Sequence, residues 1–388
     1  MRIVLDLSAV RTTGTIVYTE GFLPAFLELL ASDDELIIFG PPGLQQLMLP
    51  LTRKNARFVA NPSAVMVPRR ILWQQFVLPG LLSRLKADVL FEPYDVGPWY
   101  SKCPMALGVR NPTPVILAER ILKLVWHEKL QRYIHMGLVK GSCRKAESVL
   151  FPSRYASDRM GELLSVPSAK RRVVHHGLDL EFWDGSAASE AATGPDSNPY
   201  ILFASKFYRQ KRASLLLEAF HAWRQHHDRG DYRLVFCGED RSTPAAVSMM
   251  RRIQELGLEA EVQLLGIVDR PVLRELYRKA SICVLPTVLE TFGFPYVEAM
   301  ASKTPLVCAD IAIARELCGE AAYYFRADDR EALVAALEEA CHNTPSRVRK
   351  LAEGSRRALN FSWRREAEET LACIRAAAGI EMKAGALA

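Results

Sequence analysis

Short apolar runs alternate with longer amphipathic stretches along most of this chain. The runs have the length and composition of buried strands, and the stretches between them repeat their apolar residues at helical spacing. The strand candidates are residues 3–7, 36–39, 57–60, 89–91, 105–109, 149–151 and 173–175 in the first half, and residues 200–204, 233–237, 262–265, 282–285, 306–308 and 322–325 in the second. Strands that alternate with crossover helices are typical of doubly wound parallel sheets. The pattern therefore predicts an α/β fold.

The alternation is interrupted at residues 184–199. This segment is rich in Ala, Ser, Gly, Pro and Asp and lacks periodicity, so it predicts a linker. A chain of 388 residues, 49% of them hydrophobic, exceeds what one core usually supports. We therefore expect two doubly wound domains, residues 1–183 and residues 200–360.

The strongest functional signal is the stretch PTVLETFGFPYVEAMASKTP, residues 286–305, which follows a predicted strand and leads into a predicted helix. Glu290 lies in the loop and Glu298 in the first turn expected for the helix. Between them stand Phe292, Gly293 and Phe294. Carboxylates suit sugar hydroxyls, and a helix start suits a phosphate, so a nucleotide sugar fits this combination. A carboxylate near a helix start and a Pro-Gly loop also occur without any ligand, and the spacing alone leaves both interpretations open.

A second cluster follows the predicted strand at residues 200–204. Four cations, Lys206, Arg209, Lys211 and Arg212, crowd one strand-to-helix loop. In a doubly wound domain such loops lie at the carboxyl edge of the sheet, where ligands bind, so the cations can neutralise a diphosphate. A solvated basic loop explains the same residues without a ligand.

Residues 290–301 match the pattern Glu-x-Phe-Gly-x-Pro-x-x-Glu-Ala-Met-Ala at every fixed position. In this stretch the chain resembles glycosyltransferase family 4, the retaining nucleotide-sugar transferases with two Rossmann-like domains, an arrangement called the GT-B fold. The similarity runs almost continuously over residues 173–325. It implies that Glu298 binds the ribose and Glu290 the donor sugar. It also implies a last helix, about residues 361–380, that packs back on the first domain.

The cationic loop resembles a second family pattern, Gly-Arg-x-x-x-x-Lys-Gly, whose Arg and Lys hold the diphosphate. Lys211 matches the Lys, Lys206 replaces the Arg, and Ser205 and Arg212 replace the two glycines. The resemblance makes Lys211, Lys206 and Ser205 candidates for the diphosphate site. Lys206 lacks the bidentate guanidinium fork, so it is a weaker candidate than Lys211.

The remaining candidates also rest on the resemblance. The family holds the base with backbone groups near the place of Ile267 and Val268, and it has a glycine-rich loop near the diphosphate where this chain has Gly14. After the strand at residues 105–109 the family commonly has a His-Asp pair, whose His meets the donor sugar. Arg110 and Asn111 stand at that place here, and they are our candidates for this catalytic position.

Positive charge is concentrated in the first half. Residues 1–180 contain 23 Lys and Arg against 15 Asp and Glu, whereas the remainder contains 27 against 29. Residues 68–86 combine Arg69 and Arg70 with apolar side chains such as Phe76, as an interfacial helix would. A core-packing helix interrupted by a proline is the other interpretation. An anionic membrane surface is thus a candidate partner, and nucleic acid is not expected because no binding motif accompanies the charge.

The cysteines and the N-terminus indicate the compartment. Eight cysteines are scattered without a Cys-x-x-Cys pair, and several stand in apolar strand-like runs, which is typical of buried thiols in a reducing cytosol. The N-terminus has the pattern of a strand and not of a signal peptide, and no apolar run reaches the length of a membrane span. We expect a cytoplasmic protein, peripheral on the inner face of the membrane or soluble.

These patterns favour a retaining hexosyltransferase that moves a hexose from a nucleoside-diphosphate sugar to a glycolipid or polysaccharide-precursor acceptor. The sequence does not identify the base, UDP, GDP or ADP. No Asp-x-Asp triplet occurs, so we expect neither a metal nor another cofactor. Two alternatives stay open: a non-catalytic nucleotide-sugar-binding partner of another transferase, and a GT-B nucleotide-sugar epimerase, which should lack the signature at residues 290–301. A dehydrogenase is excluded by the missing Gly-x-Gly-x-x-Gly.

Overall fold

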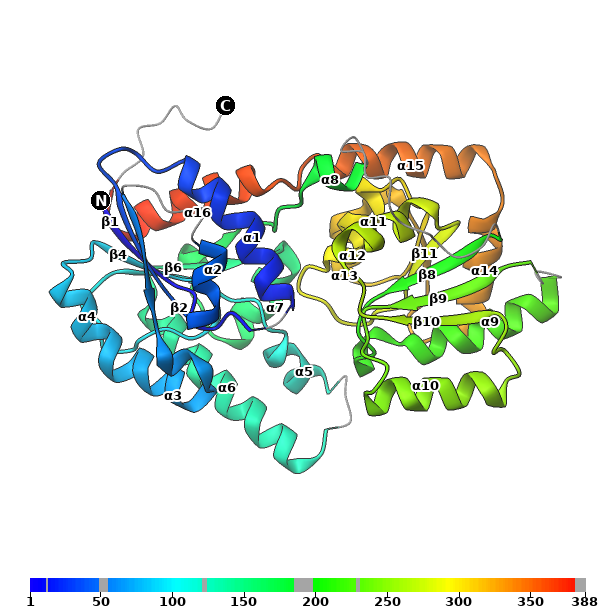
Figure 1. Ribbon diagram of the computed structural model, residues 1–388, viewed down its shortest axis with the longest axis horizontal. Helices are drawn as coiled ribbons and strands as arrows, with labels where there is room; N and C mark the ends of the chain where they lie inside the picture. Colours follow the sequence, from blue (N-terminus) through cyan, green and yellow to red (C-terminus); the bar gives the residue numbers. More distant parts are fainter. Residues whose placement is uncertain (12, 49–54, 121–123, 185–197, 228–230, 381–388) are drawn as a thin grey trace. The chain divides into compact units, whose positions relative to one another are not determined.

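A computed structural model describes residues 1–11, 13–48, 55–120, 124–184, 198–227 and 231–380 of the chain (Figure 1). The chain forms two compact units, of which the first contains Met1–Gly177 and Ser362–Ala388 and the second contains Leu178–Phe361. Nearly all of the predicted linker, residues 184–199, lies outside the described residues. Each unit has its own parallel sheet and its own hydrophobic core.

The first unit is built on a sheet in the order β3-β2-β1-β4-β5-β6-β7. Its strands are β1 (Arg2–Asp6), β2 (Glu35–Gly40), β3 (Ala56–Ala60), β4 (Val89–Glu92), β5 (Met105–Gly108), β6 (Ser148–Phe151) and β7 (Arg171–Val173). Every neighbouring pair is parallel. The central strands are buried along their whole length, which explains their unbroken apolar runs in the sequence.

Helices cover both faces of this sheet. They are α1 (Thr13–Glu28), η1 (Pro42–Leu44), α2 (Gln45–Met48), η3 (Pro62–Val65), α3 (Val67–Leu72), the π-helical segment η4 (Trp73–Val77), α4 (Leu78–Arg84), α5 (Thr113–Glu119), α6 (Trp126–Lys145), α7 (Arg154–Leu163), η5 (Ser168–Lys170) and α16 (Trp363–Ala377). The resemblance implies a last helix at about residues 361–380. This is α16, which lies beside α1 in Figure 1 although the whole second unit separates the two in sequence.

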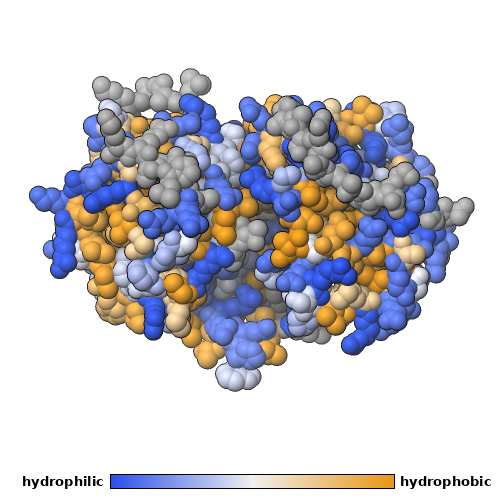
Figure 2. All heavy atoms as spheres, viewed as in Figure 1, coloured by the Kyte–Doolittle hydropathy of each residue, from blue (hydrophilic) through white to orange (hydrophobic). Residues whose placement is uncertain are grey.

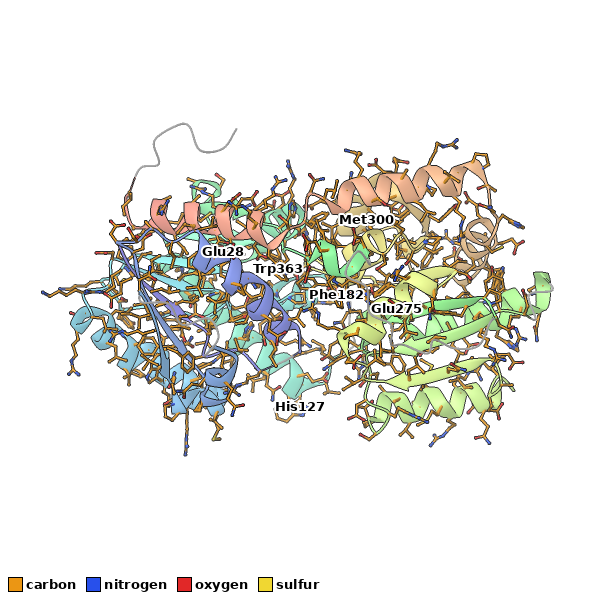
Figure 3. All side chains as sticks on the ribbon, turned by 45° about the horizontal axis from the view of Figure 1, so that its top comes forward. Glu28, His127, Phe182, Glu275, Met300 and Trp363 are labelled. Carbon is orange, nitrogen blue, oxygen red and sulfur yellow. The ribbon has the colours of Figure 1, made fainter. Side chains whose placement is uncertain are left out.

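Aromatic packing joins α16 to α1. The Trp363 ring centroid lies 6.0 Å from that of Tyr18, edge to face, and a Cβ added to Gly21 would overlap the Trp363 indole. Figure 3 labels Trp363 where the two helices meet. Glycine at this position of α1 lets the two helix axes approach each other.

The second unit has a sheet in the order β10-β9-β8-β11-β12-β13, again with parallel neighbours. Its strands are β8 (Tyr200–Ala204), β9 (Arg233–Cys237), β10 (Val262–Gly266), β11 (Ile282–Leu285), β12 (Leu306–Ala309) and β13 (Ala322–Phe325). Its helices are α8 (Leu180–Asp184), η6 (Arg209–Lys211), α9 (Ala213–His227), α10 (Pro244–Glu255), α11 (Arg270–Lys279), α12 (Phe294–Ala301), α13 (Ala312–Cys318), η7 (Gly319–Ala321), α14 (Arg330–Cys341) and α15 (Pro345–Ala358).

The predicted α/β fold with two doubly wound sheets is confirmed, and each strand expected from the sequence has a counterpart within two residues. The largest shift concerns β7, predicted at residues 173–175 and found at Arg171–Val173. β7 is an edge strand with exposed side chains, so its apolar signal is weak. Its pairing extends one residue further, because Val174 N–H donates to Phe151 O at 2.9 Å.

The cysteines are all described, and the structure joins none of them in a disulfide. Seven of the eight are buried, as the apolar runs around several of them indicated. Among the described residues, no helix combines the length and the apolar character that crossing a membrane requires.

Candidate functional site

The carboxyl edge of the second sheet carries most of the predicted site. β8 and β11 are neighbours at the point where the strand order reverses, because the chain continues from β8 to β9 on one side and from β11 to β12 on the other. Ligands of open α/β sheets bind at such a switch point. The loops after these two strands touch, since Val288 N–H donates to Gln210 O at 2.9 Å.

An ion pair joins the same two loops. Lys211, at the end of η6, contacts Glu290 through Nζ and Oε1. The two side chains are only 12% and 19% exposed, so water screens their attraction poorly. The structure thus brings together a predicted phosphate-binding cation and a predicted sugar-binding carboxylate, which lie 79 residues apart in sequence.

Gly293 is required by the turn that follows Glu290. Its φ is +91°, and an added Cβ would lie 2.7 Å from the Tyr296 ring and 3.2 Å from Glu290 Cγ. Phe292 is 3% exposed and packs against Phe294 and Phe361, with ring centroids 5.6 Å and 5.7 Å away. The side chain of Phe292 therefore belongs to the core, and the prediction that it binds a ligand can concern only its backbone.

Glu298 lies one turn deeper in α12 than the sequence suggested. The helix begins at Phe294, so its first turn contains no acidic residue and Glu298 stands in the second turn. Tyr277 of α11 donates its hydroxyl to Glu298 Oε2 at 3.1 Å. Burial raises the pKa of Glu298 to about 7, while the Tyr277 hydrogen bond and the charge of Arg270 lower it. Glu298 therefore takes up a proton near neutral pH.

The start of the cationic loop is packed against the next loop of the sheet edge. Ser205 N–H donates to Cys237 O at 2.9 Å, and a Cβ on Gly238 would lie 3.1 Å from the Ser205 backbone. The Lys206 ammonium lies 6.0 Å from the centroid of the Tyr208 ring. Ser205 and Lys206 are thus held at the same edge as Lys211.

The end of this loop explains one departure from the family pattern. Arg212, which replaces a glycine, has a φ of +53°, a left-handed conformation that glycine adopts at lower cost. Its guanidinium binds both carboxylate oxygens of Asp328, at 2.6 Å and 2.9 Å. The bidentate pair holds a backbone conformation that the arginine disfavours.

Ile267 and Val268 follow β10 at the same edge. Gly266 has a φ of +82° and accepts a hydrogen bond from Gly238 N–H at 2.8 Å, so this loop is joined to the one after β9. The Ile267 side chain is 64% exposed. An exposed apolar side chain at a sheet's carboxyl edge offers a surface to a flat ring.

Arg110 of the first unit is directed into the fold. Its guanidinium carbon lies 3.7 Å from the centroid of the Tyr18 ring, and its Nη2 lies 3.9 Å from Glu366 Oε1. Glu366 also contacts His176 Nδ1 at 2.9 Å and accepts from Gly177 N–H at 2.8 Å. Burial lowers the pKa of His176. This network holds α16 to the sheet, and the cavity beside it, about 10 Å³, has room for one water.

Gly14 and Asn111 are placed by local structure. Gly14 is the second residue of α1 and not part of a loop, and an added Cβ would meet no atom within 4 Å. Asn111 accepts from the backbone and hydroxyl of Thr113 at 3.0 Å and 2.8 Å, which closes a turn before α5. Asp95 holds the preceding backbone, accepting from Arg110 and Asn111 N–H. Both candidate residues thus lie in the first unit.

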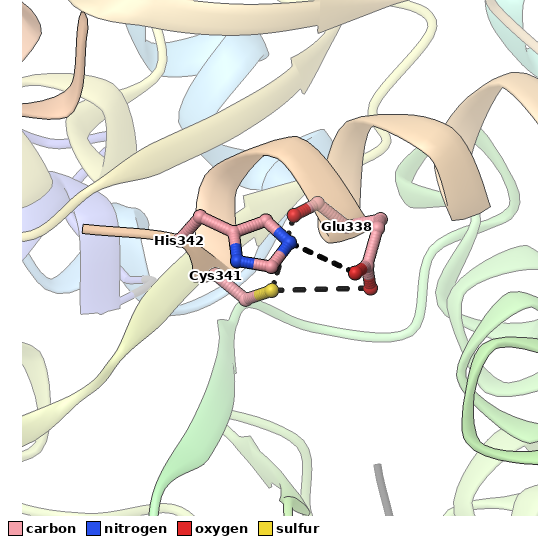
Figure 4. Close-up of side chains that lie close together, drawn as sticks. All are labelled: Glu338, Cys341 and His342. Carbon is pink, nitrogen blue, oxygen red and sulfur yellow. Dashed lines mark hydrogen bonds and ion pairs between the residues drawn. The ribbon is translucent and has the colours of Figure 1, made fainter. Parts of the chain in front are cut away.

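A group of metal-ligand types ends α14, within the described part of the chain. Glu338, Cys341 and His342 place their ligand atoms within 4.8 Å of one another (Figure 4). Glu338 already accepts from the Trp223 indole at 2.8 Å and contacts His342 at 2.9 Å, so protein partners satisfy its carboxylate. Crossover helices run opposite to the strands, so this end of α14 lies at the amino edge of the sheet. The group is a hydrogen-bonded helix end, away from the candidate site.

Three residues that organise the site edge were missed by sequence reasoning. Tyr277 binds Glu298, Asp328 binds Arg212, and Glu239 accepts from the N–H of Phe207 at 2.6 Å. Glu239 had one signal, its place directly after a strand and a glycine. The others had none, because they come from elements whose neighbours are fixed only by the sheet order.

Comparison with known sequences finds similarity to glycosyltransferases. Residues 187–357 match the family model described as glycosyl transferases group 1. The O-antigen chain mannosyltransferase RfbU of Salmonella typhimurium is 25% identical over 209 residues, 54% of this chain and 55% of its own length. The lipopolysaccharide core biosynthesis mannosyltransferase LpcC of Rhizobium leguminosarum bv. viciae is 30% identical over 228 residues, 56% of this chain and 60% of its own. The chain thus spans between half and two thirds of these relatives.

Solved structures match the whole chain. A glycosyltransferase from Rickettsia africae is 15% identical with a TM-score of 0.71, covering 97% of this chain and 98% of its own. HepE of Anabaena, solved in complex with UDP-glucose, is 14% identical with a TM-score of 0.70, covering 96% and 99%. At these identities the likeness concerns the fold, which is the GT-B fold expected from the resemblance.

Proposed function

We propose that this protein is a retaining hexosyltransferase that uses a nucleoside-diphosphate sugar, because residues 187–357 match the model of the group 1 glycosyltransferases. The observation that carries the proposal is the Lys211–Glu290 ion pair at the carboxyl edge of the second sheet, followed by Glu298 in the second turn of α12. It combines a poorly screened cation with two carboxylates, the groups that a diphosphate and a polyol require. The acceptor is a glycolipid or a polysaccharide precursor.

Each polar group has a role in donor binding. Lys211 has three N–H donors, so it can keep Glu290 and still reach a diphosphate oxygen. Lys206 adds a second positive charge to the same loop. Glu298, once ionised, accepts from the ribose hydroxyls, and the other oxygen of Glu290 accepts from the hexose hydroxyls.

Backbone and apolar groups complete the donor site. Ser205, Gly293 and Phe294 offer backbone groups near the phosphates and the sugar, and Ile267 and Val268 offer a surface to the base. Such contacts position the donor, whereas the charged groups act on the reaction.

The reaction exchanges one glycosidic bond for another on the same face of the sugar. The bond between the anomeric carbon and the phosphate oxygen breaks, and the acceptor oxygen bonds to that carbon. The acceptor proton passes to the leaving phosphate, which departs as the nucleoside diphosphate. Lys211 and Lys206 stabilise the negative charge that develops on the phosphate. Glu290 binds the sugar more strongly as the sugar gains positive charge. No metal is needed in this scheme.

The relatives favour a hexose and a surface-polysaccharide acceptor. RfbU and LpcC are named as mannosyltransferases of O-antigen and lipopolysaccharide core. HepE was solved with UDP-glucose, so the base is best tested with UDP, GDP and ADP sugars side by side. The excess positive charge in residues 1–180 suits peripheral attachment to the inner face of an anionic membrane, where lipid-linked acceptors are presented.

A thermal-shift panel of UDP-, GDP- and ADP-sugars tests donor binding, since a ligand that binds the folded state raises its unfolding temperature. We expect one nucleotide class to raise it, and we expect an α-linked donor to give an α-linked product by NMR. A β-linked product would contradict retention. No shift with any donor would contradict the proposal as a whole.

One observation favours a second candidate, a non-catalytic partner that binds a nucleotide sugar. Arg110 and Asn111 stand where the family that this chain resembles has a catalytic His-Asp pair. Both are engaged in contacts that hold the first unit together. A binding partner would show the thermal shift and form no product with any acceptor.

A further inference from the structure

The first unit exposes a group of large apolar side chains around α3. The docking face comprises Val65, Met66, Val67, Leu72, Phe76 and Val77, from the end of η3 to the end of η4. Each is between 47% and 76% exposed. Scattered exposed apolar residues are ordinary, but six within thirteen residues of sequence are a concentration that is typical of an interaction surface. Figure 1 places α3 at the lower edge of the first unit, and Figure 2 shows hydrophobic side chains gathered there among hydrophilic ones.

The polarity of η4 is inverted. Gln74 is buried and donates to Asp6 and Glu92 at 2.9 Å and 3.1 Å, and to Val96 O at 3.1 Å. The side chain of Phe76, two residues later, is 76% exposed. A helix that only packs on a core turns its apolar side inward. Here an amide faces inward and a phenylalanine faces outward within the same π-helical turn.

Gln75, the residue after Gln74, is held inward as well. Gln75 donates to Gly97 O at 3.0 Å and accepts from Trp99 N–H at 3.1 Å. Both glutamines therefore anchor η4 to the fold through hydrogen bonds, and the docking face does not need its apolar side chains for packing. The exposed side chains of α3 and η4 are free to serve an intermolecular contact.

The charge around the docking face is of one sign. Between Glu35 and Asp88 the sequence contains seven Lys and Arg residues and no Asp or Glu. Arg69, within α3, is exposed, and Arg84 and Lys86 are exposed after it. The carboxylates that contact Gln74, those of Asp6 and Glu92, are buried beneath η4. Exposed apolar side chains bordered by exposed cations complement a bilayer with anionic headgroups.

A second exposed apolar stripe lies at the start of α6. Trp126, Leu130, Tyr133 and Ile134 recur at helical spacing and are more than half exposed. This stripe includes the carboxylate of Glu128, whereas the docking face has none. Charge therefore favours the docking face as the membrane contact.

We propose that the docking face inserts Leu72, Phe76 and Met66 into the interface of an anionic bilayer, while Arg69 binds lipid phosphates. This proposal rests on the proposed function, because membrane binding would bring the enzyme to a lipid-linked acceptor. α3, η4 and α4 together span residues 67–84 and carry both apolar and cationic side chains. Such a segment lies in the plane of the bilayer interface.

Sedimentation with vesicles tests the docking face. Wild type, Leu72→Ser/Phe76→Ser and Arg69→Glu are mixed with phosphatidylcholine vesicles with and without phosphatidylglycerol. We expect wild type to bind only the anionic vesicles, and more weakly at high salt. Each variant should lose about 10-fold or more in partitioning. Matched controls on α15 of the second unit, Val348→Ser and Arg349→Glu, change residues that are also exposed and should bind like wild type.

Three outcomes would overturn the proposal. In the first, wild type binds neutral and anionic vesicles equally, and in the second, both face variants bind vesicles like wild type. In the third, only the Leu130→Ser/Tyr133→Ser variant of α6 loses vesicle binding. Face variants that change only self-association, measured by sedimentation equilibrium, would overturn it as well. The nucleotide thermal shift is recorded on the same proteins. A retained shift with lost vesicle binding supports the docking face, whereas a wild type that binds vesicles without any shift refutes only the transferase function.

Discussion

At the residue scale, the Lys211–Glu290 pair couples the two halves of a nucleotide-sugar site. The ammonium that would meet the diphosphate is also the partner of the carboxylate that would meet the sugar. Because both side chains are largely buried, the loss of either leaves the other with an unpaired charge in a poorly solvated place.

Lys211→Ala should weaken nucleoside-diphosphate binding and lower turnover together. Removal of a charge-assisted contact costs about 1.5–3 kcal/mol, or roughly 10- to 150-fold in affinity. Isothermal titration with the diphosphate alone measures this loss without requiring an acceptor. Arg209→Ala removes an exposed cation from the same η6 turn and should change affinity little. Equal effects of the two substitutions would show that the loop acts only through its total charge.

The raised pKa of Glu298 predicts how the stability of the fold depends on pH. Burial raises its pKa from 4.5 to about 7, so the folded state holds this proton more tightly than the unfolded state. The corresponding stabilisation is complete below pH 4.5 and is lost as the pH rises to about 7. Glu298→Gln should therefore flatten the stability profile across this range and raise stability at pH 8 relative to wild type.

Donor affinity should respond in the opposite direction. An ionised carboxylate accepts hydrogen bonds more strongly than a neutral one, so wild-type affinity should rise as the pH passes about 7. Glu298→Gln should bind more weakly and without this dependence. Urea unfolding and donor titration at several pH values measure the two effects. Parallel profiles in both proteins would remove Glu298 from the ribose site.

At the element scale, the close packing of α1 and α16 depends on a missing side chain. Gly21→Ala places a methyl group where the Trp363 indole lies, so α16 must shift and stability should fall by about 1–3 kcal/mol. Gly137, within α6, has open space around an added Cβ. Gly137→Ala should instead raise stability by about 0.5–1 kcal/mol, because alanine favours the helix. Thermal unfolding compares the two, and a tolerated Gly21→Ala would mean that the helices are not in contact.

At the scale of the whole molecule, the predicted donor contacts are divided between the two units. Gly14 belongs to the first unit, whereas Lys211, Glu290 and Glu298 belong to the second. An alanine at Gly14 meets no atom and lies in a helix, so the fold should tolerate it. If a diphosphate approaches this backbone closely, the added methyl group should weaken donor binding several-fold.

Gly43→Ala is the matched control, because it also lies in the first unit with open space around its Cβ. It should bind the donor like wild type. Titration of both variants, with thermal unfolding to show intact folding, decides whether the first unit contributes. Unchanged affinity in Gly14→Ala would confine the predicted diphosphate contacts to the second unit.

The sequence by itself determined the strands, the class of fold and the loops that carry the candidate site. A strand buried on both faces is a continuous apolar run, so burial is recorded locally in the order of residues. The signature at residues 290–301 is local in the same way, and so is the cationic loop that ends at Lys211.

Only the tertiary structure decided which of these residues meet. Lys211 reaches Glu290 because β8 and β11 are neighbours, and the Glu298 carboxylate of α12 meets the Tyr277 hydroxyl of α11. The tertiary structure also decided that Arg110 is buried against Tyr18 and Glu366. It likewise decided that Gln74 of η4 faces the interior. Strand order and helix contacts result from packing between distant segments, and no local pattern of apolar and polar residues encodes them.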